Sequence, residues 1–171
     1  ILLLIQRYLR TDMLTPFMKS VTFLGNGGWF WILCAVVLLA VPKTRKTGYA
    51  AALSLIFGAI VTNLLLKNIV ARPRPFAEIE ALIPMITKPK DFSFPSGHTT
   101  ASFAVALVML RMLPKKFGIP AVVLAALVAF SRLYLGVHYP TDVLTGFVIA
   151  LVGSMLSVWI VRTKPEDKQV H

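Results

Sequence analysis

Long apolar runs separated by short polar segments make up most of this sequence, and they restrict what the chain can fold into. Of its 171 residues, 57% are hydrophobic and only 15% are charged, and the mean hydropathy is +0.75. A soluble domain of this length needs a larger polar surface than these residues supply. The sequence therefore predicts a multi-pass protein of the cell membrane, with an all-α fold.

Five apolar runs approach the roughly 20 residues that a helix needs to cross a bilayer. The predicted spans are 29–41 with part of 21–28, 48–66, 96–113, 119–130 with an extension toward 135, and 143–161. Before them, Ile5 and Tyr8 recur at helical spacing, with Gln6, Arg7 and Arg10 on the opposite side. This pattern predicts an amphipathic helix lying in the membrane interface. We expect a single domain over 1–171, in which 1–26 is the interfacial segment and 67–142 carries the polar motifs. A second short helix is expected to begin at Thr15-Pro16.

The formal net charge is +11, from 18 basic and 7 acidic side chains. The basic residues are scattered among loops and form no continuous stripe, so a nucleic acid is not an expected partner. Three basic clusters fall on one side of the predicted bundle and favour a cytoplasmic location for that side. They are Lys43, Arg45 and Lys46; Arg111, Lys115 and Lys116; and Arg162, Lys164 and Lys168. The polar loops 67–95 and 131–142 then lie together on the extracytoplasmic side, although other basic residues add positive charge there too.

The stretch Pro95-Ser96-Gly97-His98 directly precedes one of the apolar runs. A helix that starts here leaves several backbone N–H groups without acceptors, and its dipole favours an anion at this end. His98 would then be a proton carrier beside an anion site. The alternative is that Ser96 only caps the helix and that His98 is an interfacial polar residue.

Several cations stand near this helix start in the predicted topology. Lys67 ends one span, and prolines on both sides of Arg74 in Arg72-Pro73-Arg74-Pro75 hold the chain extended. A planar guanidinium matches phosphate oxygens and an ammonium adds a compact charge, so the pair suits a phosphoryl group. The alternative is that these side chains extend to the lipid headgroups.

A further cation, a second imidazole and a carboxylate occur in the loop 131–142, as Arg132, His138 and Asp142. Tyr139-Pro140 is unsuited to a continuing helix, so His138 is placed in a turn and Asp142 at the start of the last span. A carboxylate that accepts a hydrogen bond from one ring nitrogen leaves the other nitrogen as a nucleophile or base. On this face Asp142 is the one carboxylate that we expect among the cations.

These residues resemble the signature of the type 2 phosphatidic acid phosphatase family, a group of membrane-integrated, metal-independent lipid phosphatases. All three parts of the signature are present and in order. They are Lys67 with Arg74-Pro75, Pro95-Ser96-Gly97-His98, and Ser131-Arg132 with His138 and Asp142. Many members of that family have six spans, whereas five and an amphipathic helix are predicted here.

The resemblance implies a reaction and a role for each residue. His138 would attack phosphorus to form a phosphohistidine, Asp142 would orient it, and His98 would protonate the leaving oxygen and later activate water. No cofactor and no metal ion are expected, because fixed cations would take the place of a metal. The groups implied to hold the phosphoryl oxygens are Lys67, Arg74, Arg132, the Ser96 hydroxyl and the Gly97 N–H.

The expected substrate is a lipid phosphate or diphosphate within the bilayer. A polyprenyl diphosphate, such as the undecaprenyl carrier lipid of bacterial cell-wall synthesis, is the first choice, and phosphatidylglycerophosphate, phosphatidic acid and a lipid A phosphate are alternatives. Two readings outside this class remain open at this point. One is an anion transporter, since charged groups near spanning helices also mark permeation paths, and the other is a lipid-binding protein without catalysis.

Overall fold

The computed structural model describes residues 1–163, and the regular secondary structure in this range is entirely helical. This confirms the predicted all-α fold. The helices, in chain order, are α1 (Leu2–Tyr8), α2 (Leu14–Phe23), α3 (Trp29–Ala40), α4 (Arg45–Ala59), α5 (Lys67–Val70), α6 (Pro75–Glu78), α7 (Gly97–Met112), α8 (Lys115–Tyr134) and α9 (Pro140–Thr163). A π-helical segment, Ile60–Leu66, joins α4 to α5, and Lys164 and Lys168 lie outside the described residues.

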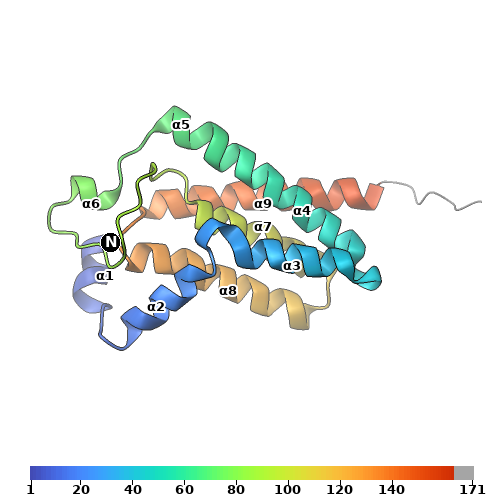
Figure 1. The fold of residues 1–171 in the computed structure, drawn as a ribbon, viewed down its shortest axis with the longest axis horizontal. Helices are drawn as coiled ribbons and strands as arrows, with labels where there is room; N and C mark the ends of the chain where they lie inside the picture. Colours follow the sequence, from blue (N-terminus) through green and yellow to red (C-terminus); the bar gives the residue numbers. More distant parts are fainter. Residues whose placement is uncertain (164–171) are drawn as a thin grey trace, which may run out of the picture.

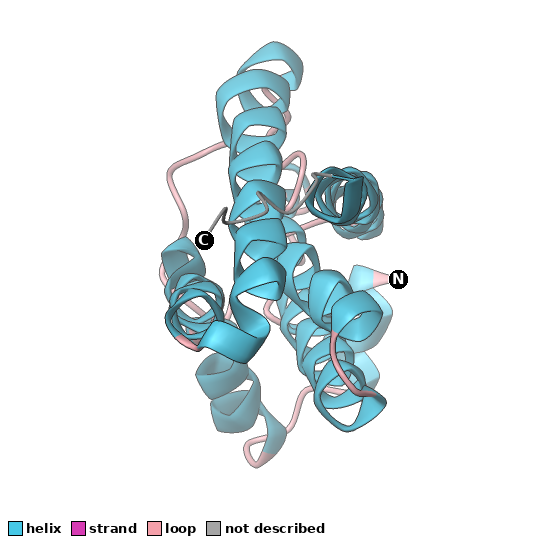
Figure 2. Cartoon of the chain, turned by 90° about the vertical axis from the view of Figure 1, so that its right-hand side faces the viewer, coloured by secondary structure: helices cyan, strands magenta, loops and turns pink. Residues whose placement is uncertain are grey.

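Helix α7 lies in the middle of the bundle, because α4, α8 and α9 all pack against it. Figure 2 shows the helical bundle turned by 90° from the view of Figure 1. Nine of its 16 residues are buried, and Ala104, Val105, Ala106 and Val108 have no exposed surface. A helix that is apolar on all sides is stable only when neighbours surround it, and small side chains let those neighbours approach closely. The helix that begins at the predicted anion site is therefore also the core of the fold.

Within residues 1–163, three segments are long and apolar enough to cross a membrane: Pro42–Glu78, Lys115–Tyr134 and Pro140–Thr163. Helices α2 and α3, which meet at a bend of 44°, would provide a fourth crossing if they act together. This agrees with the expectation that the first span draws on residues before Trp29. With 16 residues, α7 is shorter than the roughly 20 that a bilayer requires, so the predicted span over 96–113 stays a prediction.

Helix boundaries differ from the predicted ones where packing extends a helix beyond its apolar run. The fourth predicted span was expected to begin at Ile119, but α8 begins at Lys115. Gly118 allows this extra turn, because a Cβ atom there would lie only 2.5 Å from the Cα atom of Leu110. The close approach of α7 and α8 thus adds a polar turn to the start of α8, which the hydropathy of the sequence did not indicate.

The predicted N-terminal amphipathic helix is present as α1, and it packs on the end of α8. Leu2 and Ile5 are buried, with Ile5 in a cluster that includes Tyr134 and Leu135, whereas Tyr8 is exposed. The second short helix was expected to begin at Thr15 and begins one residue earlier.

The long loops gather at one end of the bundle, as the predicted topology requires (Figure 1). The segment between α5 and α7 and the turn between α8 and α9 lie at this end. The α3–α4 hairpin, the α7–α8 turn and the end of α9, with their basic clusters, lie at the opposite end.

Candidate active site

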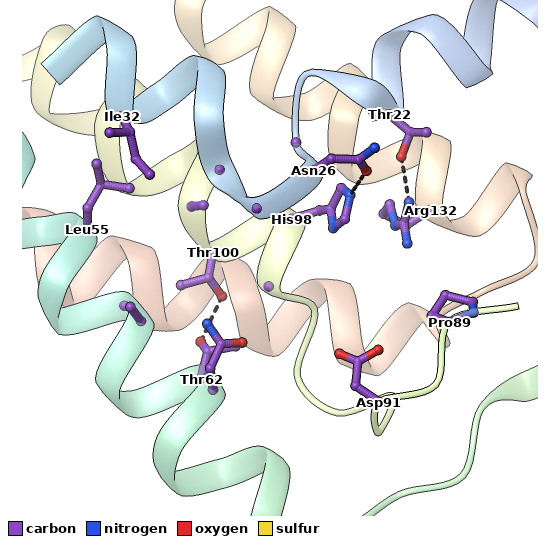
Figure 3. Close-up of a pocket in the computed structure, with 18 of the residues that line it drawn as sticks. Thr22, Asn26, Ile32, Leu55, Thr62, Pro89, Asp91, His98, Thr100 and Arg132 are labelled. Atoms are coloured by element: carbon purple, nitrogen blue, oxygen red, sulfur yellow. Dashed lines mark hydrogen bonds between the residues drawn. The ribbon is translucent and has the colours of Figure 1, made fainter. Parts of the chain in front are cut away.

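A cavity of about 890 Å³ opens at the loop end of the bundle and extends between α3 and α4. Its lining is apolar along the two helices, where Ile32, Leu55 and Ile56 contribute, and polar at the loop end (Figure 3). Six of the eight predicted site residues line it: Lys67, Arg74, Gly97, His98, Arg132 and His138. The other two, Ser96 and Asp142, have no exposed surface and lie behind it. The structure therefore brings together residues from three distant parts of the sequence.

His138 sits in the turn between α8 and α9, with 2% of its surface exposed. Gly136 makes this turn possible, since its φ of 75° lies in the left-handed region that glycine adopts readily. The Nδ1 atom of His138 lies 3.4 Å from Oδ2 of Asp142. On the other side of the ring, Nε2 lies 3.3 Å from Nη1 of Arg74.

These two neighbours define the tautomer of His138. A guanidinium can only donate hydrogen bonds, so the nitrogen that faces Arg74 must carry the lone pair. The proton then lies on Nδ1, on the side of the Asp142 carboxylate. Burial, partly opposed by Asp142 and reinforced by Arg132 and Arg74, lowers the pKa of His138 to about 4. The imidazole is therefore neutral at neutral pH and presents the lone pair of Nε2 to the polar end of the cavity.

The expected hydrogen bond between His138 and Asp142 is not formed in this structure. Although the two atoms lie 3.4 Å apart, Nδ1 of His138 has no hydrogen-bond partner among the described residues. The physical reason is that Oδ2 of Asp142 already accepts from the Ser93 hydroxyl at 2.5 Å and from the Tyr139 N–H at 2.9 Å. A short shift of the ring would be needed to add a third bond.

Arg72 holds the other oxygen of Asp142. Its Nη1 donates to Asp142 Oδ1 at 2.9 Å and to Thr141 at 2.8 Å, and its guanidinium stacks on the Tyr139 ring at 3.7 Å. The sequence placed Arg72 among the cations of this face, but it did not predict that Arg72 and Ser93 fix the carboxylate. No local signal could have shown this, since both lie far from Asp142 in the chain.

Arg74 and Lys67 are both paired with a carboxylate that the sequence analysis missed. Asp91 bonds to Lys67 and, through Oδ1, to Nη2 of Arg74 at 2.7 Å. Burial alone would raise the pKa of Asp91, but the hydrogen bond and charge of Lys67, together with Arg74, lower it to about 2. The expectation of a single carboxylate on this face is therefore wrong, because the loop before α7 folds back over the cations.

The start of α7 has the geometry of a capped helix. The Ser96 hydroxyl accepts from the N–H of Thr99 and from its hydroxyl, at 3.4 and 3.0 Å, and it does not line the cavity. This geometry favours the capping role of Ser96 over direct contact with a phosphate. Gly97 and His98 do line the cavity, and among the described residues their N–H groups have no acceptor outside the helix.

Arg132 and His98 each contact the segment around the break between α2 and α3. Arg132, with 2% of its surface exposed, donates to Thr22 at 2.6 Å, and its Nε is buried without a partner among the described residues. An unpaired buried donor at a cavity wall suits an incoming anion. His98 Nε2 lies 2.9 Å from Oδ1 of Asn26. The sequence analysis assigned no role to Thr22 or Asn26.

Comparison with known proteins agrees with this arrangement. Residues 47–166 match the PAP2 superfamily. The chain is 36% identical over 148 residues to an undecaprenyl-diphosphatase of Sulfolobus acidocaldarius, covering 85% of this chain and 71% of that protein. Its fold superimposes on the crystal structure of Aquifex aeolicus LpxE with a TM-score of 0.82 and 25% identity, covering 92% of each chain.

A second solved structure is the PAP2-type phosphatidylglycerolphosphate phosphatase of Bacillus subtilis. It has a TM-score of 0.73 and 28% identity, and the match covers 93% of this chain and 82% of that one. The superfamily match spans more than half of the chain and includes every predicted site residue. The transporter and the non-catalytic lipid-binding protein are thereby set aside. This chain belongs to the PAP2 superfamily and is a membrane lipid phosphatase.

Proposed function

We propose that this phosphatase removes phosphate from a polyprenyl diphosphate at the loop end of the bundle, through a phosphohistidine on His138. The observation that carries the proposal is the position of Nε2. It bears the lone pair of a buried neutral imidazole, and it lies 3.3 Å from a guanidinium that can bind the phosphoryl oxygens. A nucleophile beside a fixed cation is the arrangement that phosphoryl transfer needs.

In the first step Nε2 of His138 attacks the terminal phosphorus and the bond from phosphorus to the leaving oxygen breaks. His98 gives a proton to that oxygen, and Asp142 stabilises the positive charge that develops on His138. In the second step His98 takes a proton from water, the water oxygen attacks phosphorus, and the bond to His138 breaks to release inorganic phosphate. The charge on the phosphoryl oxygens is met by Lys67, Arg74, Arg132 and the N–H of Gly97.

The shape of the cavity supports an amphiphilic substrate. Its polar end holds the cations, and its apolar arm runs between α3 and α4 past Leu55 toward Leu39. A phosphate bound at the polar end would therefore continue into an apolar chain along these helices. The Sulfolobus relative is named for undecaprenyl diphosphate, which favours a polyprenyl chain in this arm. Phosphatidylglycerophosphate is the second candidate, because a solved structure of the same fold is a phosphatase for that lipid.

We further propose that the site faces the extracytoplasmic side. The basic clusters at the opposite end of the bundle include Lys43, Arg45, Arg111, Lys116 and Arg162. Such residues in short loops are typical of the cytoplasmic side.

The mechanism is tested by single-turnover kinetics with p-nitrophenyl phosphate, which has a good leaving group. The wild-type protein should release a burst of nitrophenol and keep acid-labile phosphate bound, and His138→Ala should give neither. Asp142→Asn should retain a reduced burst, because it keeps the nucleophile and loses the charge that stabilises it. A burst that survives in His138→Ala would overturn the assignment of the nucleophile.

The same protein, given a panel of lipid phosphates in mixed micelles, tests the substrate. We expect the highest kcat/KM for undecaprenyl diphosphate, and a higher value for phosphatidylglycerophosphate would select the second candidate. No group of three or more His, Cys, Asp or Glu side chains suited to a metal occurs among the described residues. We therefore expect activity to persist in excess EDTA, and loss of activity that is restored by Mg²⁺ would contradict the mechanism.

A further inference from the structure

The short break between α2 and α3 passes directly over His98. Asn26, in this break, places its Oδ1 atom 2.9 Å from Nε2 of His98. One residue earlier, a Cβ atom on Gly25 would lie 2.5 Å from Cδ2 of the same ring. The backbone at Gly25 therefore lies close against the imidazole, and the Asn26 amide meets Nε2 of the ring (Figure 3).

The contact with Asn26 determines which nitrogen of His98 is available for proton transfer. When His98 is ready to act as an acid, both of its nitrogens carry protons, so Asn26 can bind it only through the amide oxygen. The Nε2 proton is then held by Asn26. The Nδ1 atom has no hydrogen-bond partner among the described residues, and the ring lines the cavity. Nδ1 is thus the atom that remains for exchange with a substrate oxygen.

A second contact from the same segment reaches another predicted site residue. Thr22, on the last turn of α2, accepts a hydrogen bond of 2.6 Å from Nη1 of the buried Arg132. Both Thr22 and Asn26 precede residue 47, where the match to the superfamily begins. The α2–α3 break thus supplies contacts to a proton carrier and to a cation that both lie within the matched segment.

We propose that Asn26 is a positioning residue for catalysis. It holds the Nε2 proton of His98, fixes the ring against Gly25 and leaves Nδ1 to donate the proton to the leaving oxygen. This inference rests on the proposed role of His98 as the general acid. Without the amide oxygen the ring can rotate and change tautomer. The reaction rate should therefore fall for substrates whose leaving oxygen needs a proton.

The test compares two substrates that differ in this need. Dodecyl phosphate has an alkoxide leaving group that requires protonation. The nitrophenolate of p-nitrophenyl phosphate is a good leaving group and departs without a proton. Asn26→Leu keeps the size of the side chain and removes the acceptor. We expect a loss of about 10- to 100-fold in the first-turnover rate with dodecyl phosphate, part of the roughly 10²–10⁴ that general acid catalysis contributes, and little change with p-nitrophenyl phosphate. Asn26→Asp keeps an acceptor oxygen and should restore the rate with dodecyl phosphate.

Trp29→Phe is the matched control for a purely structural role of the break. The Trp29 Nε1 atom donates to the Phe23 carbonyl at 2.9 Å and so spans the same bend, but Trp29 does not line the cavity. We expect this variant to lower thermal stability in detergent without changing the ratio of the two rates. An equal loss on both substrates in Asn26→Leu, or a selective loss in Trp29→Phe, would overturn the positioning role.

His98→Ala, measured in parallel, separates this inference from the proposed function. If His98→Ala loses no more activity with dodecyl phosphate than with p-nitrophenyl phosphate in the first turnover, the proposed acid role itself fails. If His98→Ala shows the selective loss and Asn26→Leu does not, only the role of Asn26 fails.

Discussion

Asp142 is fixed from three sides before any substrate arrives. Arg72 holds one carboxylate oxygen, and Ser93 and the Tyr139 N–H hold the other. In the proposed mechanism positive charge develops on the neighbouring His138, and a carboxylate already held by these donors needs little reorganisation to stabilise that charge.

The buried neutral state of His138 makes the stability of the protein depend on pH. An unfolded histidine takes up a proton below its ordinary pKa of 6.5, whereas the folded pKa is about 4. This contribution to the free energy of unfolding is complete above pH 6.5 and declines as the pH falls toward 4, because the unfolded chain then binds the additional proton. We expect His138→Gln to flatten this decline in thermal unfolding measured in detergent. Parallel curves for the two proteins from pH 7 to pH 4 would contradict it.

Asp91 is paired with Lys67 and Arg74, two of the cations proposed to bind the phosphoryl group. We expect Asp91→Asn to tighten inhibition by orthovanadate by up to about fivefold. Although both cations are largely buried, 51% of the Asp91 side chain is exposed, so solvent screens its charge and the estimate follows the roughly 0–1 kcal/mol of screened ion pairs. Glu80→Gln removes the same charge from an exposed position in the same loop and should leave inhibition unchanged. Weaker inhibition in Asp91→Asn would show that the carboxylate orients Lys67 and Arg74 for the anion.

At the scale of the helix, glycines set how closely the neighbours of α7 approach it at its two ends. At the site end, a Cβ atom on Gly146 of α9 would lie 2.8 Å from the Ser96 carbonyl oxygen. At the other end, a Cβ atom on Gly118 of α8 would lie 2.5 Å from Leu110. A glycine-to-alanine substitution can therefore be made against α7 at two places, one near the candidate site and one far from it.

We expect Gly146→Ala and Gly118→Ala both to lower the thermal stability of the protein, because either methyl group would overpack a close helix contact. Only Gly146→Ala should also lower kcat by tenfold or more per folded molecule, since it displaces the turn that carries His98. Steady-state kinetics on detergent-purified protein, normalised to the folded fraction, measure this difference. Equal effects on kcat would show that the position of the α7 start does not limit catalysis.

At the scale of the whole molecule, the separation of basic clusters from the site predicts its orientation in the cell. In a Cys34→Ala background, Glu80→Cys should react with a membrane-impermeant maleimide in intact cells, and Lys116→Cys should react only after lysis. Both positions are exposed in the structure and lie at opposite ends of the bundle. The reverse pattern would place the site in the cytoplasm.

The sequence alone determined the fold class and the membrane setting, and it predicted the residues of the candidate site. Apolar runs reveal spanning helices because the bilayer requires a length and a polarity that can be counted along the chain. The residues of the candidate site could be predicted because their chemistry is concentrated in three short motifs beside helix ends, and six of the eight line one cavity. The amphipathic character of α1 was visible for the same reason, since helical spacing is a local property.

Contacts between residues far apart in the chain were decided only by the tertiary structure. Asp91 reaches Lys67, 24 residues away, because the loop before α7 folds back, and Asn26 reaches His98 across 72 residues because α2 and α3 bend over the start of α7. The same packing explains why α8 begins a turn early, at Lys115, since Gly118 lies close against α7. It also sets the 3.4 Å between His138 and Asp142, since Ser93 and Tyr139 compete for the same oxygen. Local sequence specifies which groups are available, and the packing of helices around α7 decides which of them meet.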